Sequence, residues 1–431
     1  MNYIALTIGP IYKTLQNSKK PKELWSGSFI FSYIMKQIIK EFKDREFVTP
    51  YIKDNSIFED NSEVGLFHDR FIFKSKENDI YKLKSVVDDV LDDISDKLNI
   101  NKETTKEYLQ INYDEYDIGD DKNPILEISP YLDTQELFFQ TSQNSQSFIN
   151  AIKNKENFLL KNKNIVDDLK KLTYHSYYCI IHADGDNMSK VIADKNNIED
   201  VSKNLFEYCK ISNSLIEKFG GQTIFAGGDD LLFFAPVVSK KKKQTVFELC
   251  DEIGRDFEKR FNSVATLSFG ITINYVKFPL YEALENSREQ LFEKAKSGSK
   301  NNISFKVTKH SGQSFEAVVH KGNNEVYSKF LEFVSNIASD NDDKNFLHSL
   351  HHKIDTYKTT INHIADSKEK LHNFFDNYFN KDEHKKYRDY FDSLIEFIYE
   401  IFQDKTIQKD EKLNIVYATL RFVKFVKGEK K

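Results

Sequence analysis

The chain has few cysteines and no long run of apolar residues. Its three cysteines, Cys179, Cys209 and Cys250, are isolated, and none has the CxxC spacing of a zinc site. We therefore expect reduced thiols in the protein core and no zinc. The sequence also lacks a stretch of about eighteen apolar residues, and Met1 leads straight into a strand-like segment without a basic signal region. These absences predict a cytoplasmic protein with no membrane span.

A large excess of charge of one sign is also lacking. The 431 residues carry a formal net charge of −5, with 30% charged, 39% hydrophobic and 14% aromatic residues. This composition is typical of a globular chain, and the length suits about two to four domains. A slightly acidic chain does not coat nucleic acid by itself, so an RNA partner would need positive charge from other subunits or from a local patch. The run Lys240–Lys243 is either such a patch or a solvated loop.

The middle of the chain contains a Gly-Gly-Asp-Asp segment, Gly227–Asp230, between the apolar runs 222–226 and 231–235. This pattern predicts two strands joined by a tight turn that carries paired carboxylates. Glycine suits the turn because a Cβ there would block a positive φ and the close approach of a nucleotide. Carboxylates at a strand end suit Mg²⁺, which binds oxygen ligands in near-octahedral geometry. An ordinary hairpin is the alternative interpretation of this segment.

A second acidic element lies upstream. The apolar run 177–181 leads into an Asp-Gly-Asp segment and then into a predicted helix. In the palm of a nucleotidyltransferase this strand lies next to the hairpin strands, so Asp184 and Asp186 are expected to face the hairpin carboxylates. Four carboxylates at one point repel one another unless cations lie between them. Two Mg²⁺ (or Mn²⁺) ions would meet that need, one activating the attacking hydroxyl and one holding the leaving phosphates.

A third element follows the hairpin. Residues 264–273 have the pattern of a buried strand, and a helix is predicted over residues 280–296. The end of this helix places Lys296 and Lys300 around a glycine. These lysines either cap the helix, where cations and glycine are favoured, or neutralise a bound triphosphate. Residues 173–312 together have the order β-α-α-β-β-α-β, which is that of a ferredoxin-like palm.

The acidic strand end, the hairpin and the lysine segment together resemble the catalytic palm of the large subunit of type III CRISPR effector complexes, the CRISPR polymerase family. GGDEF-type diguanylate cyclases are similar, but their hairpin has Glu after Asp. The resemblance implies that Asp184, Asp229 and Asp230 are catalytic. The metal ligands that it implies are Asp184, Asp186, Asp229 and Asp230. The nucleotide-binding residues that it implies are Gly185, Asp186, Gly227, Gly228, Ser268, Lys296 and Lys300.

The N-terminal region carries a second, weaker resemblance. Residues 3–10 end in Ile-Gly-Pro, and residues 22–30 contain Leu-Trp-Ser-Gly-Ser at a predicted helix start. Both resemble the first, inactive palm of the Cmr-type (III-B) large subunit. Segment 66–71 departs from that family's Pro-Asn-Arg-Phe pattern at His68 and Asp69, which we expect at a surface strand edge. This region has the order β-α-β-β-α-β and no acidic pair, so the resemblance implies a palm that lacks Mg²⁺ and completes a composite nucleotide pocket.

The remainder of the chain has a different pattern. From residue 324 onward apolar residues recur at helical spacing, which predicts a helical bundle rich in aromatic residues. The resemblance implies that this bundle docks on the small-subunit filament of the effector. The chain is therefore expected to be α+β, with two ferredoxin-like palms and a C-terminal helical bundle. The expected domains are a degenerate palm at 1–135, a short helical linker at 136–172, the catalytic palm at 173–312 and a helical domain at 313–431.

Many members of this family carry an HD nuclease domain before the first palm. That domain needs a His…His-Asp…Asp set, whereas here the first palm begins at residue 3, so no DNase activity is expected. His348, His351 and His352 share a predicted helix with Asp355. Helix-surface histidines are commoner than a metal site with this ligand set.

The expected reaction is nucleotidyl transfer, in which the 3′-hydroxyl of one ATP attacks the α-phosphate of another and pyrophosphate leaves. Repetition and ring closure would give cyclic oligoadenylate, which the resemblance implies is a second messenger made when guide RNA pairs with target RNA. Three alternatives stay open: ATP conjugation to S-adenosylmethionine, a stand-alone palm cyclase and a non-catalytic scaffold. The expected partners are the other subunits of a type III complex with its guide and target RNA.

Overall fold

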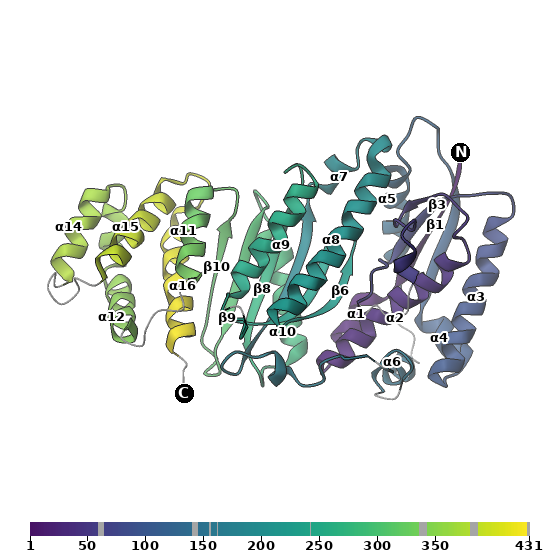
Figure 1. Cartoon of the computed structure of the whole chain (residues 1–431), viewed down its shortest axis with the longest axis horizontal. Coiled ribbons are helices and arrows are strands. Elements are labelled where there is room, and N and C mark those ends of the chain that lie inside the picture. The colour runs from purple at the N-terminus through teal and green to yellow at the C-terminus, as the bar shows by residue number, and fades with distance from the viewer. Residues whose placement is uncertain are drawn as a thin grey trace.

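The computed structural model describes residues 1–58, 64–139, 145–154, 157–161, 163–241, 243–335, 343–379 and 387–428. Two β-sheets with their helices, followed by a group of C-terminal helices, lie one after another along the long axis of the molecule (Figure 1). None of the described helices combines the length and the apolar character that crossing a membrane requires. The expected α+β class is confirmed.

The N-terminal palm contains a four-stranded antiparallel sheet. Its strands are β1 (Asn2–Gly9), β2 (Phe47–Thr49), β3 (Arg70–Lys74) and β4 (Gln110–Asp117). Its helices are α1 (Ile11–Gln16), α2 (Pro21–Lys40), η1 (Asn55–Phe58), α3 (Asp79–Leu98), α4 (Lys102–Tyr108) and α5 (Pro124–Glu136). The spatial order β2-β3-β1-β4 is the ferredoxin-like order that the sequence predicts.

Alternation along β1 explains why helices cover both faces of this sheet. Ile4 and Leu6 pack with apolar residues of α2 and α3 on one face, whereas Ala5 packs with Ile128 and Leu132 of α5 on the other. The side chain of Asn123 caps the first turn of α5, and proline follows at the first helical position. The cap fixes the start of α5, and packing of Ile128 and Leu132 holds the helix against the face of the sheet that is opposite to α2.

The region predicted as an interdomain linker, residues 136–172, is in part built into the core of the first palm. It contains α6 (Ser145–Lys153) and the short helix η2 (Leu169–Leu172). Phe148 of α6 is fully buried, and its ring stacks on Tyr108 with 4.5 Å between the ring centroids. The amphipathic pattern of α6 therefore buries one face against α2 and α4.

The second palm contains a six-stranded sheet. Its strands are β5 (Tyr177–Asp186), β6 (Gln222–Gly227), β7 (Asp230–Pro236), β8 (Thr266–Tyr275), β9 (Asn302–Thr308) and β10 (Ser314–His320). Its helical segments are α7 (Met188–Val191), η3 (Lys195–Asn197), α8 (Ile198–Phe219), α9 (Val246–Arg260), α10 (Leu280–Glu289) and the π-helical turn η4 (Gln290–Ala295). The spatial order is β10-β9-β8-β5-β7-β6.

Four consecutive strands of this sheet, β8-β5-β7-β6, repeat the order β4-β1-β3-β2 of the first palm. Strand β9 runs parallel to β8 after the crossover through α10, and β10 pairs antiparallel with β9. The sheet therefore continues past residue 312, where the sequence analysis ends the second palm. Helix α2 of the first palm packs against β6, so one apolar cluster extends across both palms.

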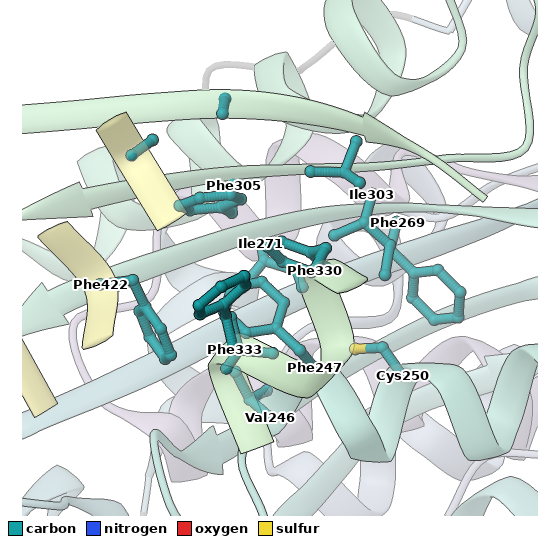
Figure 2. Packing of buried hydrophobic residues seen from close by; sticks show 14 of the residues in the cluster. Val246, Phe247, Cys250, Phe269, Ile271, Ile303, Phe305, Phe330, Phe333 and Phe422 are labelled. Carbon is teal, nitrogen blue, oxygen red and sulfur yellow. The ribbon is translucent and has the colours of Figure 1, made fainter. Parts of the chain in front are cut away.

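The C-terminal helices share a core with the second palm. They are α11 (Asn324–Ser335), α12 (Asp343–Thr356), α13 (Lys358–Ile364), α14 (Lys368–Tyr378), α15 (Arg388–Gln403) and α16 (Lys409–Gly428). Figure 2 shows Phe247 of α9 beside Phe305, Phe330 and Phe422, which come from β9, α11 and α16. The centroid of the Phe247 ring lies 5.1, 5.1 and 4.8 Å from the centroids of these three rings. This cluster joins the predicted bundle to the sheet.

Candidate catalytic site between the two palms

The Gly-Gly-Asp-Asp segment forms the tight hairpin that the sequence predicts. Strands β6 and β7 pair as far as Gly227 opposite Asp230, which leaves Gly228 and Asp229 as the two turn residues. Gly228 has a φ of +64°, a conformation that favours glycine. The turn therefore projects both carboxylates from one strand end.

The glycine between the two acids of β5 makes room for the hairpin. A Cβ on Gly185 would lie 2.4 Å from Oδ2 of Asp229 and 2.9 Å from Cγ of Met188. Any side chain at this position would displace the Asp229 carboxylate. Gly185, predicted as a nucleotide-binding residue, has this steric role in the structure.

The first acid of β5 is paired with a lysine. The ammonium of Lys296 forms an ion pair with the Asp184 carboxylate and donates a hydrogen bond of 2.9 Å to the carbonyl oxygen of Gly185. Burial and the neighbouring charge of Lys300 lower the pKa of Lys296 to about 8. The lysine segment therefore lies at the acidic strand end and directly contacts one carboxylate.

The second acid of β5, Asp186, is fully buried. Its Oδ2 accepts hydrogen bonds from Ser268 Oγ at 2.7 Å, from Thr266 Oγ1 at 3.1 Å and from the backbone N–H of Asn301 at 3.0 Å. Its Oδ1 accepts no hydrogen bond from the described residues and lies 3.9 Å from Nζ of Lys296. Ser268, predicted as a nucleotide-binding residue, is itself buried and positions Asp186.

The hairpin carboxylates lie in an environment that disfavours their charge. Burial, the adjacent Asp229 and Asp69 of the first palm together raise the pKa of Asp230 to about 7. Burial and the charge of Asp186 likewise raise the pKa of Asp229. Two carboxylates that repel each other in this way are the hard oxygen donors that Mg²⁺ prefers.

The four predicted metal ligands gather at one edge of the sheet without surrounding a single point. Over the described residues, no three side chains of His, Cys, Asp or Glu are arranged as ligands of one ion. Lys296 engages Asp184, and hydroxyl groups engage Asp186. The donor chemistry and the unpaired Oδ1 of Asp186 fit a divalent cation, whereas the expected convergence of all four carboxylates is only partial.

A cavity of about 580 Å³ separates the two palms at this edge. The hairpin Gly227–Asp230 lines one side, and His68, Asp69 and Arg70 of the first palm line another. The sequence predicts a surface strand edge for His68 and Asp69, and this prediction is wrong. Both residues are half-buried and face the hairpin across the cavity, because the segment before β3 crosses the second palm at this point. Burial and the nearby Arg70 lower the pKa of His68 to about 4, so its imidazole is neutral at pH 7.

Strand registers reveal which residues of the first palm correspond to the acids of the second. Arg70 begins β3 opposite Thr7 of β1, just as Asp230 begins β7 beside Asp184 of β5. In the first palm, helix α5 supplies the hydrogen-bond partner of Thr7 and Arg70. Its Glu136 accepts hydrogen bonds from Thr7 Oγ1 at 2.6 Å and from Arg70 Nε at 2.7 Å. The first palm therefore has no acidic pair at the corresponding positions, as predicted, although Asp69 corresponds to Asp229.

Other residues of this cavity could not be identified from their sequence context. Tyr12, His182, Arg288 and Phe292 line it, from α1, β5, α10 and η4. The only sequence signal was indirect and concerned His182. It lies two residues before Asp184, and residues two apart in a strand point to the same face. Lys242 of the lysine run and the side chain of His348 lie outside the described residues.

Comparison with known proteins identifies the family. Residues 177–304 match the family model "Cas10/Cmr2, second palm domain", and residues 3–110 match "CRISPR-associated protein Cmr2, N-terminal". The two models together match more than half of the chain. The chain belongs to the Cas10/Cmr2 family. The family that the sequence motifs indicate is thereby confirmed.

One curated relative and two solved structures match different shares of the chain. The CRISPR system Cmr subunit Cmr2 of Pyrococcus furiosus is 29% identical over 219 residues, which are 42% of this chain and 24% of that protein. A chain of the type III-B Cmr-beta complex in its apo state has a TM-score of 0.57 at 10% identity, covering 88% of this chain and 77% of that one. A chain of the Csm1-Csm4 cassette in complex with cA4 has a TM-score of 0.53 at 12% identity, covering 98% and 69%. The two structures show a shared fold.

Proposed function

We propose that this chain is a magnesium-dependent nucleotidyltransferase that uses ATP. One observation carries the proposal: the Asp-Gly-Asp strand end lies against the Gly-Gly-Asp-Asp hairpin, and the two hairpin carboxylates line a cavity shared by both palms. Asp184 and Asp186 lie beside the hairpin and do not themselves line this cavity. Paired carboxylates on adjacent strand ends, with lysines beside them, are suited to holding metal-bound phosphates for in-line transfer.

The residues of the site divide into three roles. Asp184, Asp229 and Asp230 would hold Mg²⁺, which supplies neutralising charge for the phosphates and lowers the pKa of an attacking hydroxyl. Asp186, whose carboxylate accepts a hydrogen bond from Ser268, would assist these three residues in holding the metal. Lys296 adds positive charge next to Asp184, where charge on the transferred phosphate develops.

The proposed product is cyclic oligoadenylate, made in a type III CRISPR effector when guide RNA pairs with target RNA. Membership of the Cas10/Cmr2 family supports this assembly with the other Cmr-type subunits. Structural relatives of the Csm1-Csm4 type are described in complex with cA4 and with pppApA, ligands that belong to those proteins.

A second candidate reaction joins ATP to S-adenosylmethionine. Asp69 favours it, because this carboxylate lies in the cavity where the sequence departs from the family's Asn. Asp69 adds negative charge opposite Asp229 and Asp230, and burial raises its pKa. An acceptor with a sulfonium and an ammonium group would relieve this repulsion, whereas an ATP acceptor would not.

Product analysis tests both reactions. The reconstituted effector, with guide and matching target RNA, is incubated with radiolabelled ATP and Mg²⁺, with and without S-adenosylmethionine, and products are resolved by mass spectrometry. Cyclic oligoadenylate that disappears in Asp229→Ala/Asp230→Ala supports the first reaction. A product that needs S-adenosylmethionine and falls about tenfold in Asp69→Asn, equal to ~1.4 kcal/mol, supports the second. No product under any condition would leave a scaffold as the better account.

A further inference from the structure

The helix that precedes the lysine segment changes its winding at the cavity. After α10, residues 290–295 form a π-helical turn, which adds a residue to the turn and is frequent at functional sites. A Cβ on Gly270 of β8 would lie 2.4 Å from the backbone nitrogen of Leu291 and 2.5 Å from the carbonyl oxygen of Ser287. The glycine therefore lets this backbone lie directly on the sheet. The turn leaves the ring of Phe292 on the outer side, 47% exposed.

Three neighbouring side chains from α1, α10 and this turn form what we term the inter-palm clamp: Tyr12, Arg288 and Phe292. The guanidinium carbon of Arg288 lies 4.7 Å from the centroid of the Tyr12 ring and 5.6 Å from that of Phe292. Helix α1, which carries Tyr12, and helix α10, which carries Arg288, lie side by side (Figure 1). Each palm thus contributes a planar group to the wall of the cavity.

The charge of the clamp is balanced within the protein. Glu285 of α10 lies 3.7 Å from Arg288 and accepts a hydrogen bond from the hydroxyl of Tyr12. Arg288 therefore adds little net positive charge for a phosphate group. A planar guanidinium between aromatic rings is instead suited to stacking, which needs area and orientation rather than net charge.

We propose that the inter-palm clamp binds the purine base of a nucleotide whose phosphates lie at the hairpin. This subsite rests on the proposed nucleotidyl transfer and assigns to Phe292 and Tyr12 the stacking surface for the base. Every base has a π-face, and purines have the larger one, so the clamp binds purine nucleotides more tightly than pyrimidine nucleotides. The ring of Phe292 supplies the main exposed surface.

The test measures binding rather than turnover. Isothermal titration of the 431-residue chain with Mg²⁺ compares AMPPNP, which carries a base, with inorganic tripolyphosphate, which does not. Phe292→Ala and Tyr12→Ala are each expected to weaken AMPPNP binding about tenfold and to leave tripolyphosphate binding unchanged. Phe292→Tyr retains a ring and is expected to bind as the wild type does. Tyr281→Ala is the matched control, because Tyr281 is an exposed aromatic residue of α10 that does not line the cavity.

The possible outcomes separate the clamp from the proposed reaction. If Phe292→Ala and Tyr12→Ala bind AMPPNP as tightly as the wild type does, the clamp is wrong. If the wild type binds AMPPNP no more tightly than tripolyphosphate, the clamp is wrong while nucleotidyl transfer stands. If the wild type binds neither ligand, both ideas are overturned. Equal melting temperatures of the four variants ensure that a loss of binding does not reflect unfolding.

Discussion

The two palms have the same strand order but opposite charges at the same place in the fold. In the second palm, Asp184 and Asp230 lie at adjacent strand ends, and Lys296 from the covering segment pairs with the first of them. In the first palm the corresponding residues are Thr7 and Arg70, and their partners are acids of the covering helix α5. In the second palm, Asp230 lines the cavity and Asp184 pairs with a lysine. In the first palm, Arg70 also lines the cavity, but it forms ion pairs with acids of its own palm.

This contrast shows that the ferredoxin-like fold does not depend on the carboxylates. The first palm reaches the same strand order with Arg70 paired to Asp133 at 2.7 Å and to Glu136. In the second palm, burial and mutual repulsion raise the pKa values of Asp229 and Asp230. The acids therefore destabilise the folded chain unless a cation binds, as is common for functional residues.

The largest expected effect comes from Gly185→Ala. Its Cβ would displace the Asp229 carboxylate, whereas the corresponding residue of the first palm, Ile8, carries a full side chain. We expect the rate of pyrophosphate release to fall about 100-fold, the loss typical of a misplaced catalytic group. Gly27→Ala, the same change in α2, is the control and should keep the wild-type rate, because a Cβ there would come no closer than 3.4 Å to Thr14. A fully active Gly185→Ala variant would contradict this account of the glycine.

A second comparison removes the cation of each palm. Arg70→Met leaves Asp133 and Glu136 without their partner, and it should lower the free energy of unfolding by about 1–3 kcal/mol. Lys296→Met should reduce stability less, because burial already disfavours the charge of this lysine, but should reduce the rate about tenfold. Denaturant unfolding and pyrophosphate release, both with Mg²⁺, measure the two effects. The reverse pattern would mean that the catalytic and structural cations are assigned to the wrong palms.

The smallest expected effect is a dependence of stability on pH. Because the pKa of Asp230 is about 7 in the folded chain and roughly 3.9 when unfolded, the folded state binds more protons between these values. Stability of the metal-free chain should therefore fall as pH rises through this range. Asp230→Asn removes that loss, so its melting temperature in EDTA should gain a few degrees on the wild type between about pH 5 and pH 8.

Asp69→Asn extends this comparison to the first palm. It should give a gain of the same sign, because burial raises the pKa of Asp69 itself and its charge raises the pKa of Asp230. A difference in melting temperature between Asp230→Asn and the wild type that stays constant with pH would rule out a raised pKa for Asp230.

Local sequence was sufficient to predict the hairpin and the acidic strand. Gly228 has the positive φ that a tight turn requires, and the apolar runs on both sides of Gly227–Asp230 identify the turn in the sequence. The strand before Asp184 likewise has a clear apolar pattern. The position of Asp69 was not predictable in the same way. A long connection separates β2 from β3, and only packing of the two palms decides that its end crosses the hairpin.

Two further features have the same origin. The contact of Ser268 with nucleotide stays a prediction, and its position on β8 opposite Asp184 adds a hydrogen bond to Asp186 that local sequence did not indicate. Strand β10 was assigned to the helical domain, since only its pairing with β9 places it in the sheet. Both depend on contacts between segments that are distant in sequence, which periodicity along one segment does not report.

The core that α16 shares with β9 and α9 affects how the chain acquires its site during synthesis. Phe422 closes the cluster around Phe247, although more than a hundred residues lie between them. The first palm is made early and can bury much of its core at once, whereas the sheet that carries the hairpin gains its last packing only when α16 has left the ribosome. We therefore expect nascent chains to present a folded first palm long before they can hold a nucleotide.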